Sequence, residues 1–418
     1  MKILRLRTYF YPENVAASAM MEDFENELVK RKITSVNYTP VPSRGITDEV
    51  RKEYKKKKYE ILKDGYVIVH RFPMIKEGKN FLHRTLKFIL CTAIEYFKGI
   101  KAKDIDVVFG SSTPPTQGML CAKVARKLSK KYGKKVPFVY TLQDIFPDSL
   151  VSAGMTAEGS ILWKIGRKIE DHTYRNADKI IVISRGFKKN IMEKGVPEEK
   201  ITVIPNWADT DGIYPVERKN NILFDRYGLD RDKFYISYSG NIGLSQNLDL
   251  VIEAARQMQS EMPEVCFVFI GEGAGKEPFE AKIKENGLEN IKVFPFQPYE
   301  EIAHVFSLGN VGLIISKSGV GSSSVPSKTM NYMAAEKPVI ASFDKNSELS
   351  SMIETVGFGM VADADSKDEL IDAIRSMKND KSLEEKGKRG KAYLLTELDK
   401  KKCVGKYIET MESVLKNG

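Results

Sequence analysis

The fold of this chain is decided by one stretch, Gly319-Val-Gly-Ser-Ser-Ser-Val-Pro-Ser-Lys-Thr-Met-Asn-Tyr-Met-Ala-Ala-Glu-Lys-Pro-Val-Ile-Ala341. Its small residues and its first proline, up to Ser327, predict a loop. Ser327 then stands where a helix N-cap belongs, so a helix is expected from Lys328 until Pro338 stops it. The apolar residues after Pro338 predict a short buried strand. Loop, helix and buried strand in this order are typical of an α/β domain.

The expected helix start is also a candidate anion site. Free backbone N–H groups and the positive end of the helix dipole favour a bound anion there, and phosphate is the commonest one. Lys328 in the first turn is unfavourable for the dipole by itself, and a bound phosphate would reverse that penalty. The alternative is a plain loop–helix–strand unit that binds nothing.

Length and charge indicate two domains. The 418 residues exceed one typical core, and the cysteines are far apart, which favours neither a disulfide framework nor a zinc site and fits a reducing compartment. Residues 1–200 carry 39 Lys and Arg against 23 Asp and Glu, a net charge of +16, so residues 201–418 carry −6 of the total of +10. A basic half suggests an anionic ligand or surface. Neither a signal peptide nor an apolar run long enough to span a bilayer is expected.

Strands and helices alternate along both halves, which predicts parallel, doubly wound sheets. We expect an N-terminal domain over residues 1–205 and a C-terminal domain over 206–401, with a last amphipathic helix at 402–418 that packs back on the first domain. Lys2–Leu6 is the first expected strand, and a helix is expected over 81–98.

Two features of the first half have competing interpretations. Gln143 and Asp144 follow the expected strand 137–141, so Asp144 either points into a ligand cleft or caps the next helix. The basic run Arg51–Lys58 and the helix 81–98, with Arg84 and Lys87 among large apolar residues, read either as an ordinary solvated segment and a core-facing helix or as an anionic-membrane surface.

Several other patterns do not carry a function. Gly271-Glu-Gly-Ala-Gly-Lys276 lacks the glycine spacing and the Ser or Thr of a P-loop, and it fails the dinucleotide fingerprint. Three Asp-x-Asp pairs occur in unrelated positions and are attributed to chance. The four histidines have no metal-ligand spacing, and the chain has no nucleophile elbow or nucleic-acid recognition motif.

Across nearly its whole length the chain resembles the family 4 retaining glycosyltransferases of GT-B fold, two doubly wound Rossmann-like domains facing across a cleft. The resemblance rests on the order and spacing of short motifs: Tyr11-Pro-Glu13, Ile204-Pro-Asn206, Gly240-Asn-Ile-Gly243, Gly271-Glu-Gly273 and Pro326-Ser-Lys328 with Met-Ala-Ala and Lys-Pro-Val-Ile-Ala341. Within the family, the Gly240-Asn-Ile-Gly243 and Pro326-Ser-Lys328 forms of these motifs are similar to those of one branch. That branch holds the fucosamine-type amino-sugar transferases of O-antigen and capsule synthesis.

The chain departs from the family pattern at the donor site. Asn241 and Gln246 stand near the places of the usual Arg and Lys, while Ser323 and Asn331 stand near those of the usual Glu pair. The resemblance therefore leaves Lys328, with Lys317 second, to grip a diphosphate, and it places Gln143 and Asp144 where the family often has a histidine. Asp144 and Lys328 are the expected catalytic residues. The expected donor-binding residues are Asn14, Asn241, Gly243, Gly271, Gly273, Phe296, Ser327, Lys328 and Asn331.

The resemblance implies a retaining, metal-independent transferase without cofactor. It would move a sugar from a nucleotide-diphosphate sugar, UDP-linked by family, to a lipid-linked saccharide acceptor in cell-surface polysaccharide synthesis. We expect it in the cytoplasm, held peripherally at the inner face of the membrane by its basic domain, and we expect no nucleic-acid partner. Two alternatives remain: a GT-B nucleotide-sugar 2-epimerase, and a catalytically degenerate partner subunit.

Overall fold

Continuous apolar runs build the strands of two separate sheets. All six residues of β10, Val265–Ile270, are buried, as expected for a strand covered by helices on both faces. The structure is a computed structural model that describes every residue except 14–17, 78–80, 153–154, 208–209, 320–324 and 417–418, and it leaves the side chains of 18–19, 81–82 and 152 undescribed. The chain divides into two compact units, residues 1–205 with 401–418, and residues 206–400.

The sheet of the first unit has the order β3-β4-β2-β1-β5-β6-β7-β8. Its strands pair in parallel, except that β3 runs antiparallel to β4. Their bounds are β1 Lys2–Leu6, β2 Thr34–Pro40, β3 Tyr59–Leu62, β4 Val67–Phe72, β5 Val107–Ser111, β6 Phe138–Leu142, β7 Lys179–Val182 and β8 Ile201–Val203.

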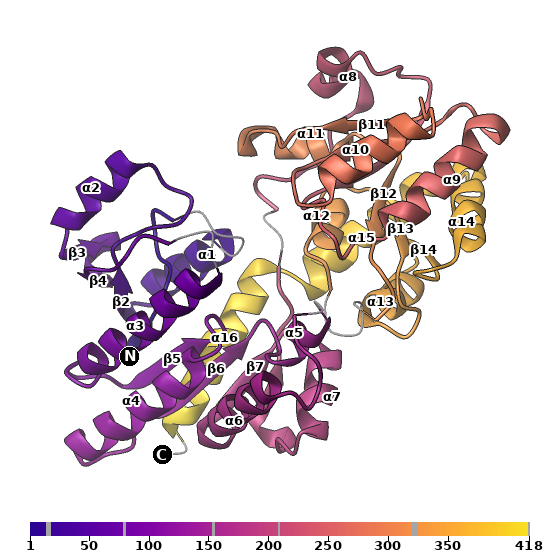
Figure 1. Ribbon diagram of the computed structural model, residues 1–418. Helices are drawn as coiled ribbons and strands as arrows, with labels where there is room; N and C mark the ends of the chain where they lie inside the picture. Colours follow the sequence, from indigo (N-terminus) through magenta and orange to yellow (C-terminus); the bar gives the residue numbers. More distant parts are fainter. Residues whose placement is uncertain (14–17, 78–80, 153–154, 208–209, 320–324, 417–418) are drawn as a thin grey trace. The chain divides into compact units, whose positions relative to one another are not determined.

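Helices cover both faces of this sheet (Figure 1). On one face α3 contacts α4 and α4 contacts α6. On the other, Phe24 of α1 packs edge to face against Tyr407 of α16, with ring centroids 5.9 Å apart. The helices of this unit are α1 Ser18–Lys30, α2 Asp48–Lys56, α3 Phe81–Gly99, α4 Gln117–Tyr132, α5 Asp148–Ser152, α6 Ile161–Asn176, α7 Arg185–Glu193 and α16 Lys400–Lys416.

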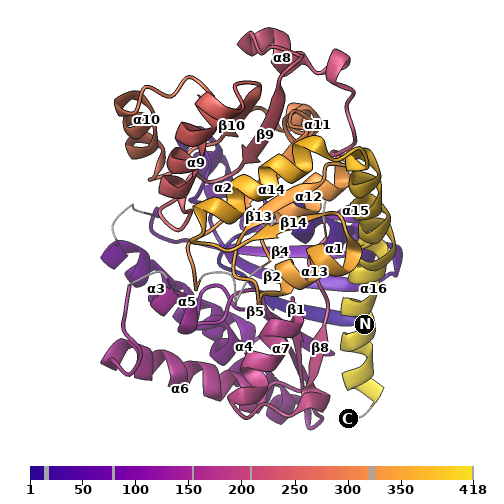
Figure 2. The same ribbon diagram turned by 90° about the vertical axis from the view of Figure 1, so that its right-hand side faces the viewer.

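The sheet of the second unit is wholly parallel, in the order β11-β10-β9-β12-β13-β14. Figure 2 labels β9, β10, β13 and β14 of this sheet. Its other strands are β9 Phe234–Ser239, β11 Ile291–Phe294, β12 Val311–Ile315, β13 Val339–Ser342 and β14 Gly359–Ala362. Helices α9 and α14 contact each other, as do α12 and α15. The helices are α8 Ile222–Tyr227, α9 Leu248–Glu261, α10 Lys276–Glu285, α11 Ile302–Ser307, α12 Lys328–Ala334, α13 Glu348–Val356, α14 Lys367–Asn379 and α15 Leu383–Glu397.

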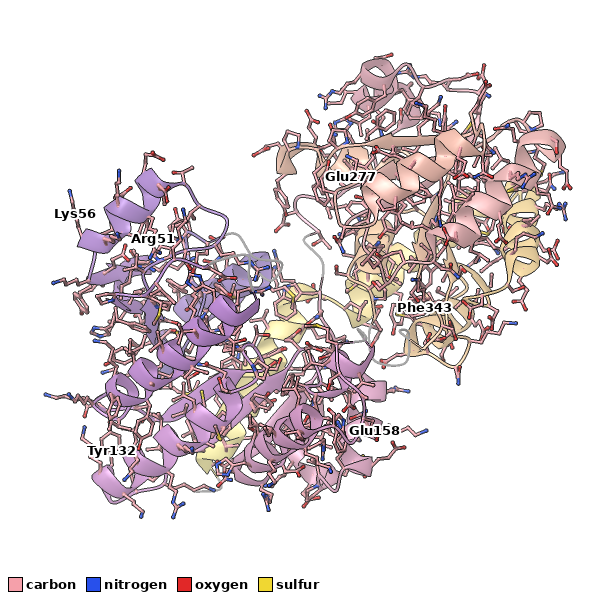
Figure 3. All side chains as sticks on the ribbon, in the orientation of Figure 1. Arg51, Lys56, Tyr132, Glu158, Glu277 and Phe343 are labelled. Atoms are coloured by element: carbon pink, nitrogen blue, oxygen red, sulfur yellow. The ribbon has the colours of Figure 1, made fainter. Side chains whose placement is uncertain are left out.

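The doubly wound α/β prediction is confirmed in both units, with two local differences. Strand β3 is an edge strand that the sequence interpretation misses, because it follows directly on the lysine run. That run lies in and after α2, where Lys56 is exposed but Arg51 is buried and donates to the Met74 carbonyl oxygen at 2.7 Å (Figure 3). The segment is therefore only partly solvated.

The membrane interpretation of the helix over 81–98 is wrong for one of its two basic residues. In α3 the Lys87 side chain is fully buried, and its Nζ lies 2.7 Å from a carboxylate oxygen of Glu77. Arg84 remains partly exposed, and the same helix exposes Leu86, Ile89 and Phe97. Among the helices that the structure describes, none is both long enough and apolar enough to cross a membrane.

Candidate functional site

The strand order of the second sheet defines one place for a ligand. From β9 the chain winds outward through β10 to β11 on one side, and from β12 through β13 to β14 on the other. The loops that leave β9 and β12 therefore diverge at their carboxyl ends. Such a switch point is where open α/β sheets bind ligands. The Gly240–Gly243 motif belongs to the loop after β9, and Lys328 begins the helix α12 that follows the loop after β12.

The glycine motifs of this edge form one close-packed pair of loops. The Gly240 N–H donates to the Ile270 carbonyl oxygen at 3.0 Å, and the Ile242 N–H donates to that of Glu272 at 2.9 Å. A Cβ on Gly271 would lie 1.9 Å from the Gly240 carbonyl oxygen, and one on Gly273 would lie 2.3 Å from that of Ile242. Only glycine fits at these positions, so backbone approaches backbone without intervening side chains.

The two polar residues in this loop, Asn241 and Gln246, have different roles. Gln246 Oε1 accepts the Gly243 N–H at 2.7 Å, so this side chain stabilises the loop itself. Asn241 is exposed, and its carbonyl oxygen accepts the Tyr238 hydroxyl at 2.6 Å. Gly243 and Gln246 also line a small depression of about 130 Å³, together with the exposed Lys317.

The Lys328 side chain extends from the start of α12 to Tyr238, near the end of β9. Its Nζ lies 3.4 Å from the centroid of the Tyr238 ring, a cation–π contact, and it packs against Gly240. Burial lowers the pKa of Lys328 to about 7. Within the described part of the chain no carboxylate forms an ion pair with it. Among the described residues this amine thus has no carboxylate partner, and it lies beside the glycine loop 240–243.

Ser327 does not cap α12 in the expected way. It occupies the position before the helix, but its backbone is right-handed helical and its side chain accepts no hydrogen bond from the helix. The helix is held instead by Tyr332, whose hydroxyl donates to the Ser237 carbonyl oxygen of β9 at 2.5 Å. Asn331 lies on α12, half-buried. Phe296, after β11, is 54% exposed.

Asp144 lies in the first unit, where the structure shows it making local contacts. The side chain bonds to Ser149 and accepts the Ile145 N–H, while burial raises its pKa. Both backbone N–H groups of Gln143 and Asp144 donate to Ser112 Oγ, at 3.0 and 3.2 Å. Gln143 Nε2 donates to the Tyr407 hydroxyl at 3.2 Å. These contacts tie Asp144 to the neighbouring residues and to Ser149 of α5, while the residue remains exposed at the surface of its unit.

The structure brings some predicted residues together and leaves others apart. Gly271 and Gly273 contact the loop 240–243, and Lys328 meets that loop at Gly240. Asn14 and Ser323 lie outside the described residues. Tyr238 is a site residue that the sequence interpretation missed; its only signal is an aromatic residue two positions before Gly240 at the end of a buried strand. Among the described residues no cluster of His, Cys, Asp and Glu could hold a metal ion.

Solved structures share this two-unit architecture. HepE of Anabaena, in complex with UDP and glucose, superposes with a TM-score of 0.72 at 16% identity over 99% of this chain and 100% of that one. Sucrose-phosphate synthase from Thermosynechococcus elongatus gives 0.73 at 16% identity over the full length of both chains. The chain therefore has the GT-B fold, two Rossmann-like domains, as the resemblance implies.

Family models place the chain more closely. Residues 17–211 match Glycosyltransferase Family 4, and residues 219–392 match Glycosyl transferases group 1. The first match covers most of the first unit and ends just inside the second, and the second match lies within the second unit. The chain is also similar to the "Putative colanic acid biosynthesis glycosyl transferase WcaI" of Escherichia coli, at 29% identity over 62% of this chain. The match spans 63% of that relative, less than two thirds of its length.

Proposed function

We propose that this protein is a glycosyltransferase that moves a sugar from a UDP-sugar to a glycan acceptor in cell-surface polysaccharide synthesis. The single observation that carries the proposal is Lys328, whose amine lies against Tyr238 at the switch point of the second sheet and has no carboxylate partner among the described residues. The matching family domains, the name of the colanic acid relative and the UDP bound to HepE support the same donor class.

The chemistry follows from where charge develops. When the sugar leaves the donor, negative charge grows on the departing diphosphate, and a fixed cation there stabilises the transition state more than the ground state. Lys328 supplies that cation, since an arriving diphosphate raises the lysine pKa and draws a proton onto Nζ. The transfer proceeds in our proposal without a metal ion and with retention of configuration.

The remaining donor contacts belong to the two glycine loops and to α12. In the proposal the close backbone packing at Gly271 and Gly273 lets the diphosphate approach main-chain N–H groups. Asn331 would bond a ribose hydroxyl through a neutral amide. Asn14, Asn241, Gly243, Phe296 and Ser327 complete the proposed donor set.

Transfer assays with Lys328→Ala test the proposal. The variant should lose sugar transfer and binding of UDP, while Lys388→Ala, an exposed lysine of α15, should keep both. EDTA should leave wild-type transfer unchanged. Full activity in Lys328→Ala would contradict the assignment, and activity lost in EDTA and restored by manganese would contradict metal independence. A new sugar isomer formed from UDP-GlcNAc alone would identify an epimerase instead.

Asp144 is proposed to orient the acceptor or to stabilise the positively charged sugar. Its exposed carboxylate at the carboxyl end of β6 supports this role, whereas its bonds to Ser149 and Ile145 support a cap. Asp144→Asn separates the two. A catalytic role predicts a lower kcat at an unchanged melting temperature, and a capping role predicts the reverse.

The acceptor is proposed to be lipid-linked, and the first unit to associate with an anionic membrane. An exposed apolar stripe runs along α3 and consists of Leu86, Ile89, Leu90 and Phe97. Lys55 and Lys56, at the end of α2, and Lys58, just after it, are also exposed. Co-sedimentation with liposomes should require anionic lipid and weaken when these three lysines are changed to glutamate. Equal recovery in the supernatant with and without anionic vesicles would contradict membrane association.

A further inference from the structure

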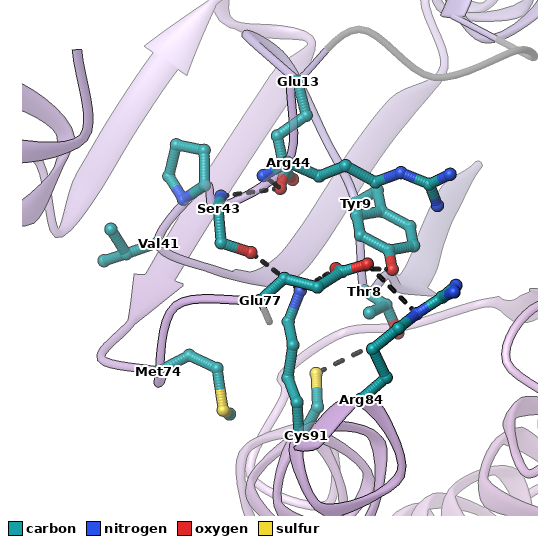
Figure 4. Close-up of polar contacts among 12 residues, drawn as sticks. Thr8, Tyr9, Glu13, Val41, Ser43, Arg44, Met74, Glu77, Arg84 and Cys91 are labelled. Carbon is teal, nitrogen blue, oxygen red and sulfur yellow. Dashed lines mark hydrogen bonds and ion pairs between the residues drawn. The ribbon is translucent and has the colours of Figure 1, made fainter. Parts of the chain in front are cut away.

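The first unit contains a polar network at the carboxyl edge of its sheet (Figure 4). Tyr9 follows β1, Ser43 follows β2, Glu77 follows β4, and Lys87 lies on α3. Lys87 Nζ donates to Ser43 Oγ and to Glu77 Oε2, both at 2.7 Å, and the Tyr9 hydroxyl donates to Glu77 Oε2 at 2.8 Å. These bonds therefore connect the loops that follow β1, β2 and β4 to one another and to α3.

A second carboxylate holds the same edge. Glu13 accepts the backbone N–H groups of Ser43 at 2.8 Å, Arg44 at 3.0 Å and Phe10 at 3.2 Å. Its contacts therefore fix the backbone of Arg44 relative to the loop that follows β1. The main chain at Arg44 therefore needs no further ordering when the guanidinium of this residue binds a ligand.

Cations exceed carboxylates in this network. Lys87, fully buried, already neutralises Glu77 from the inside, and Arg51 lies near Glu13. Two more guanidinium groups approach from the outside. Arg84 Nε lies 3.5 Å from Glu77 Oε1 with its side chain 43% exposed, and the Arg44 guanidinium carbon lies 5.5 Å from the centroid of the Tyr9 ring. Among the described residues, Lys87, Arg44 and Arg84 thus lie around the carboxylate of Glu77. The two outer cations, Arg44 and Arg84, extend to the same side in Figure 4.

The position of the pair matches that of a ligand site. The first sheet reverses its strand order between β1 and β5, and the loops that follow β1 and β2 lie at or beside that switch point. Arg44 and Arg84 approach it from the β2 loop and the start of α3. Two guanidinium forks can bind the oxygens of a phosphate or diphosphate in bidentate fashion.

We infer that Arg44 and Arg84 form a binding site for a phosphate-class oxyanion, the diphosphate that links an acceptor glycan to its lipid. That the ligand is the acceptor of a sugar rests on the proposed function. That it is a phosphate-class anion rests only on the two arginines. The apolar stripe of α3 begins two residues after Arg84, at Leu86, and continues to Phe97. A ligand with an anionic head and a hydrocarbon tail matches this order along one helix. Lys87, Glu77 and Tyr9 are positioning residues for the two arginines.

Calorimetric titration with inorganic diphosphate tests the site, with saturating UDP present so that the second unit cannot contribute. The wild type should bind, and Arg44→Gln/Arg84→Gln should bind at least about tenfold more weakly, since each charge-assisted pair is lost. Arg126→Gln/Arg175→Gln removes two exposed arginines of the same unit and should bind as wild type does. If the double variant has a lowered melting temperature, the single variant Arg84→Gln is titrated in its place.

Further titrations separate the possible sources of the phosphate. Farnesyl diphosphate should bind more tightly than inorganic diphosphate, and the difference should shrink in Leu86→Ser/Ile89→Ser. Binding to phosphatidylglycerol vesicles that depends on both arginines, without any binding of soluble diphosphate, would assign the site to lipid headgroups and overturn the inference. Equal diphosphate binding by wild type and Arg44→Gln/Arg84→Gln would also overturn it.

Failure of the proposed function gives a different result. In that case UDP would bind to neither the wild type nor the double variant, whereas the diphosphate site could still be present and respond to Arg44→Gln/Arg84→Gln. In contrast, normal UDP binding with no arginine-dependent diphosphate binding would reject this inference and leave the proposed function intact.

Discussion

Each unit holds a lysine in a poorly solvated place, and the two are treated in opposite ways. Lys87 of the first unit is fully buried and fully compensated, with Glu77 and Ser43 each 2.7 Å from its ammonium. Lys328 of the second unit rests on the Tyr238 ring, and in the described part of the chain it has no carboxylate partner. A compensated charge stabilises a fold, whereas an uncompensated one costs stability until a ligand arrives. The comparison thus distinguishes a structural lysine from a binding lysine.

The largest expected effect tests the scaffold on which Lys328 depends. Gly271→Ala places a Cβ 1.9 Å from the Gly240 carbonyl oxygen, so both glycine loops must shift. We expect a loss of about 4 kcal/mol in the free energy of unfolding of the second unit, the range of severe overpacking. Urea unfolding followed by circular dichroism measures it.

The control for that variant is Gly287→Asn. Gly287 also has a positive φ, of 61°, but open space surrounds its Cβ position, and asparagine tolerates this backbone region. It should unfold within about 1 kcal/mol of wild type. If Gly271→Ala were equally mild, the loops would be more adaptable than the structure indicates.

Removing the compensated lysine should destabilise the first unit. Lys87→Met leaves the Glu77 carboxylate in a buried network without its inner partner, which costs on the order of 3 kcal/mol because Tyr9 and Arg84 still contact it. Chemical unfolding measures this change in the free energy of unfolding. Lys76→Met, which removes one partner of the exposed Lys76–Asp48 pair, should change stability by less than about 0.5 kcal/mol. A neutral Lys87→Met would show that Glu77 finds other partners.

Removing the uncompensated lysine should do the opposite. Without ligand, Lys328→Met should raise the stability of the protein near pH 7 by on the order of 1–2 kcal/mol, because a desolvated ammonium is replaced by an apolar chain of similar length. The same variant should lose its melting-temperature shift with UDP. A destabilised Lys328→Met that still responds to UDP would remove the distinction between the two lysines.

The smallest expected effect is a pH dependence. The pKa of Lys328 is about 7 in the folded protein against an ordinary value of 10.5, so between these values the unfolded chain binds one more proton. Stability contributed by this group therefore rises with pH through that window, by at most about 1.4 kcal/mol per pH unit, and is constant below it. Unfolding at pH 7 and pH 8 should show a rise in wild type that Lys328→Met lacks.

Much of the architecture could be predicted, because it depends on local pattern. The first strand, Lys2–Leu6, has the predicted bounds, and β10 is recognised as a continuous apolar run. The edge strand β3 could not be recognised, since Tyr59-Glu-Ile-Leu62 follows a lysine run and is stabilised by β4 rather than by its own pattern.

The roles of charged residues were less predictable, because their partners are distant in the sequence. Lys87 looks like a surface residue until Ser43 and Glu77 are brought to it by the folding of three loops. Lys328 was expected in the first turn of its helix, where it lies, but Tyr238, 90 positions earlier in the numbering, is what desolvates it. Ser327 has the residue type of a cap but not the backbone angles. The catalytic and donor-binding assignments remain predictions.

The return of α16 to the first unit has a consequence for the order in which the chain is made. The Tyr407 ring packs with Phe24 and Phe109, and its hydroxyl lies 3.3 Å from Thr141 Oγ1. These partners emerge from the ribosome long before residue 407 does. The second unit, residues 206–400, is continuous in sequence and can finish folding first. During synthesis, the first unit therefore waits with the part of its sheet that α16 covers still exposed, which makes it the part of a nascent chain that chaperones would hold.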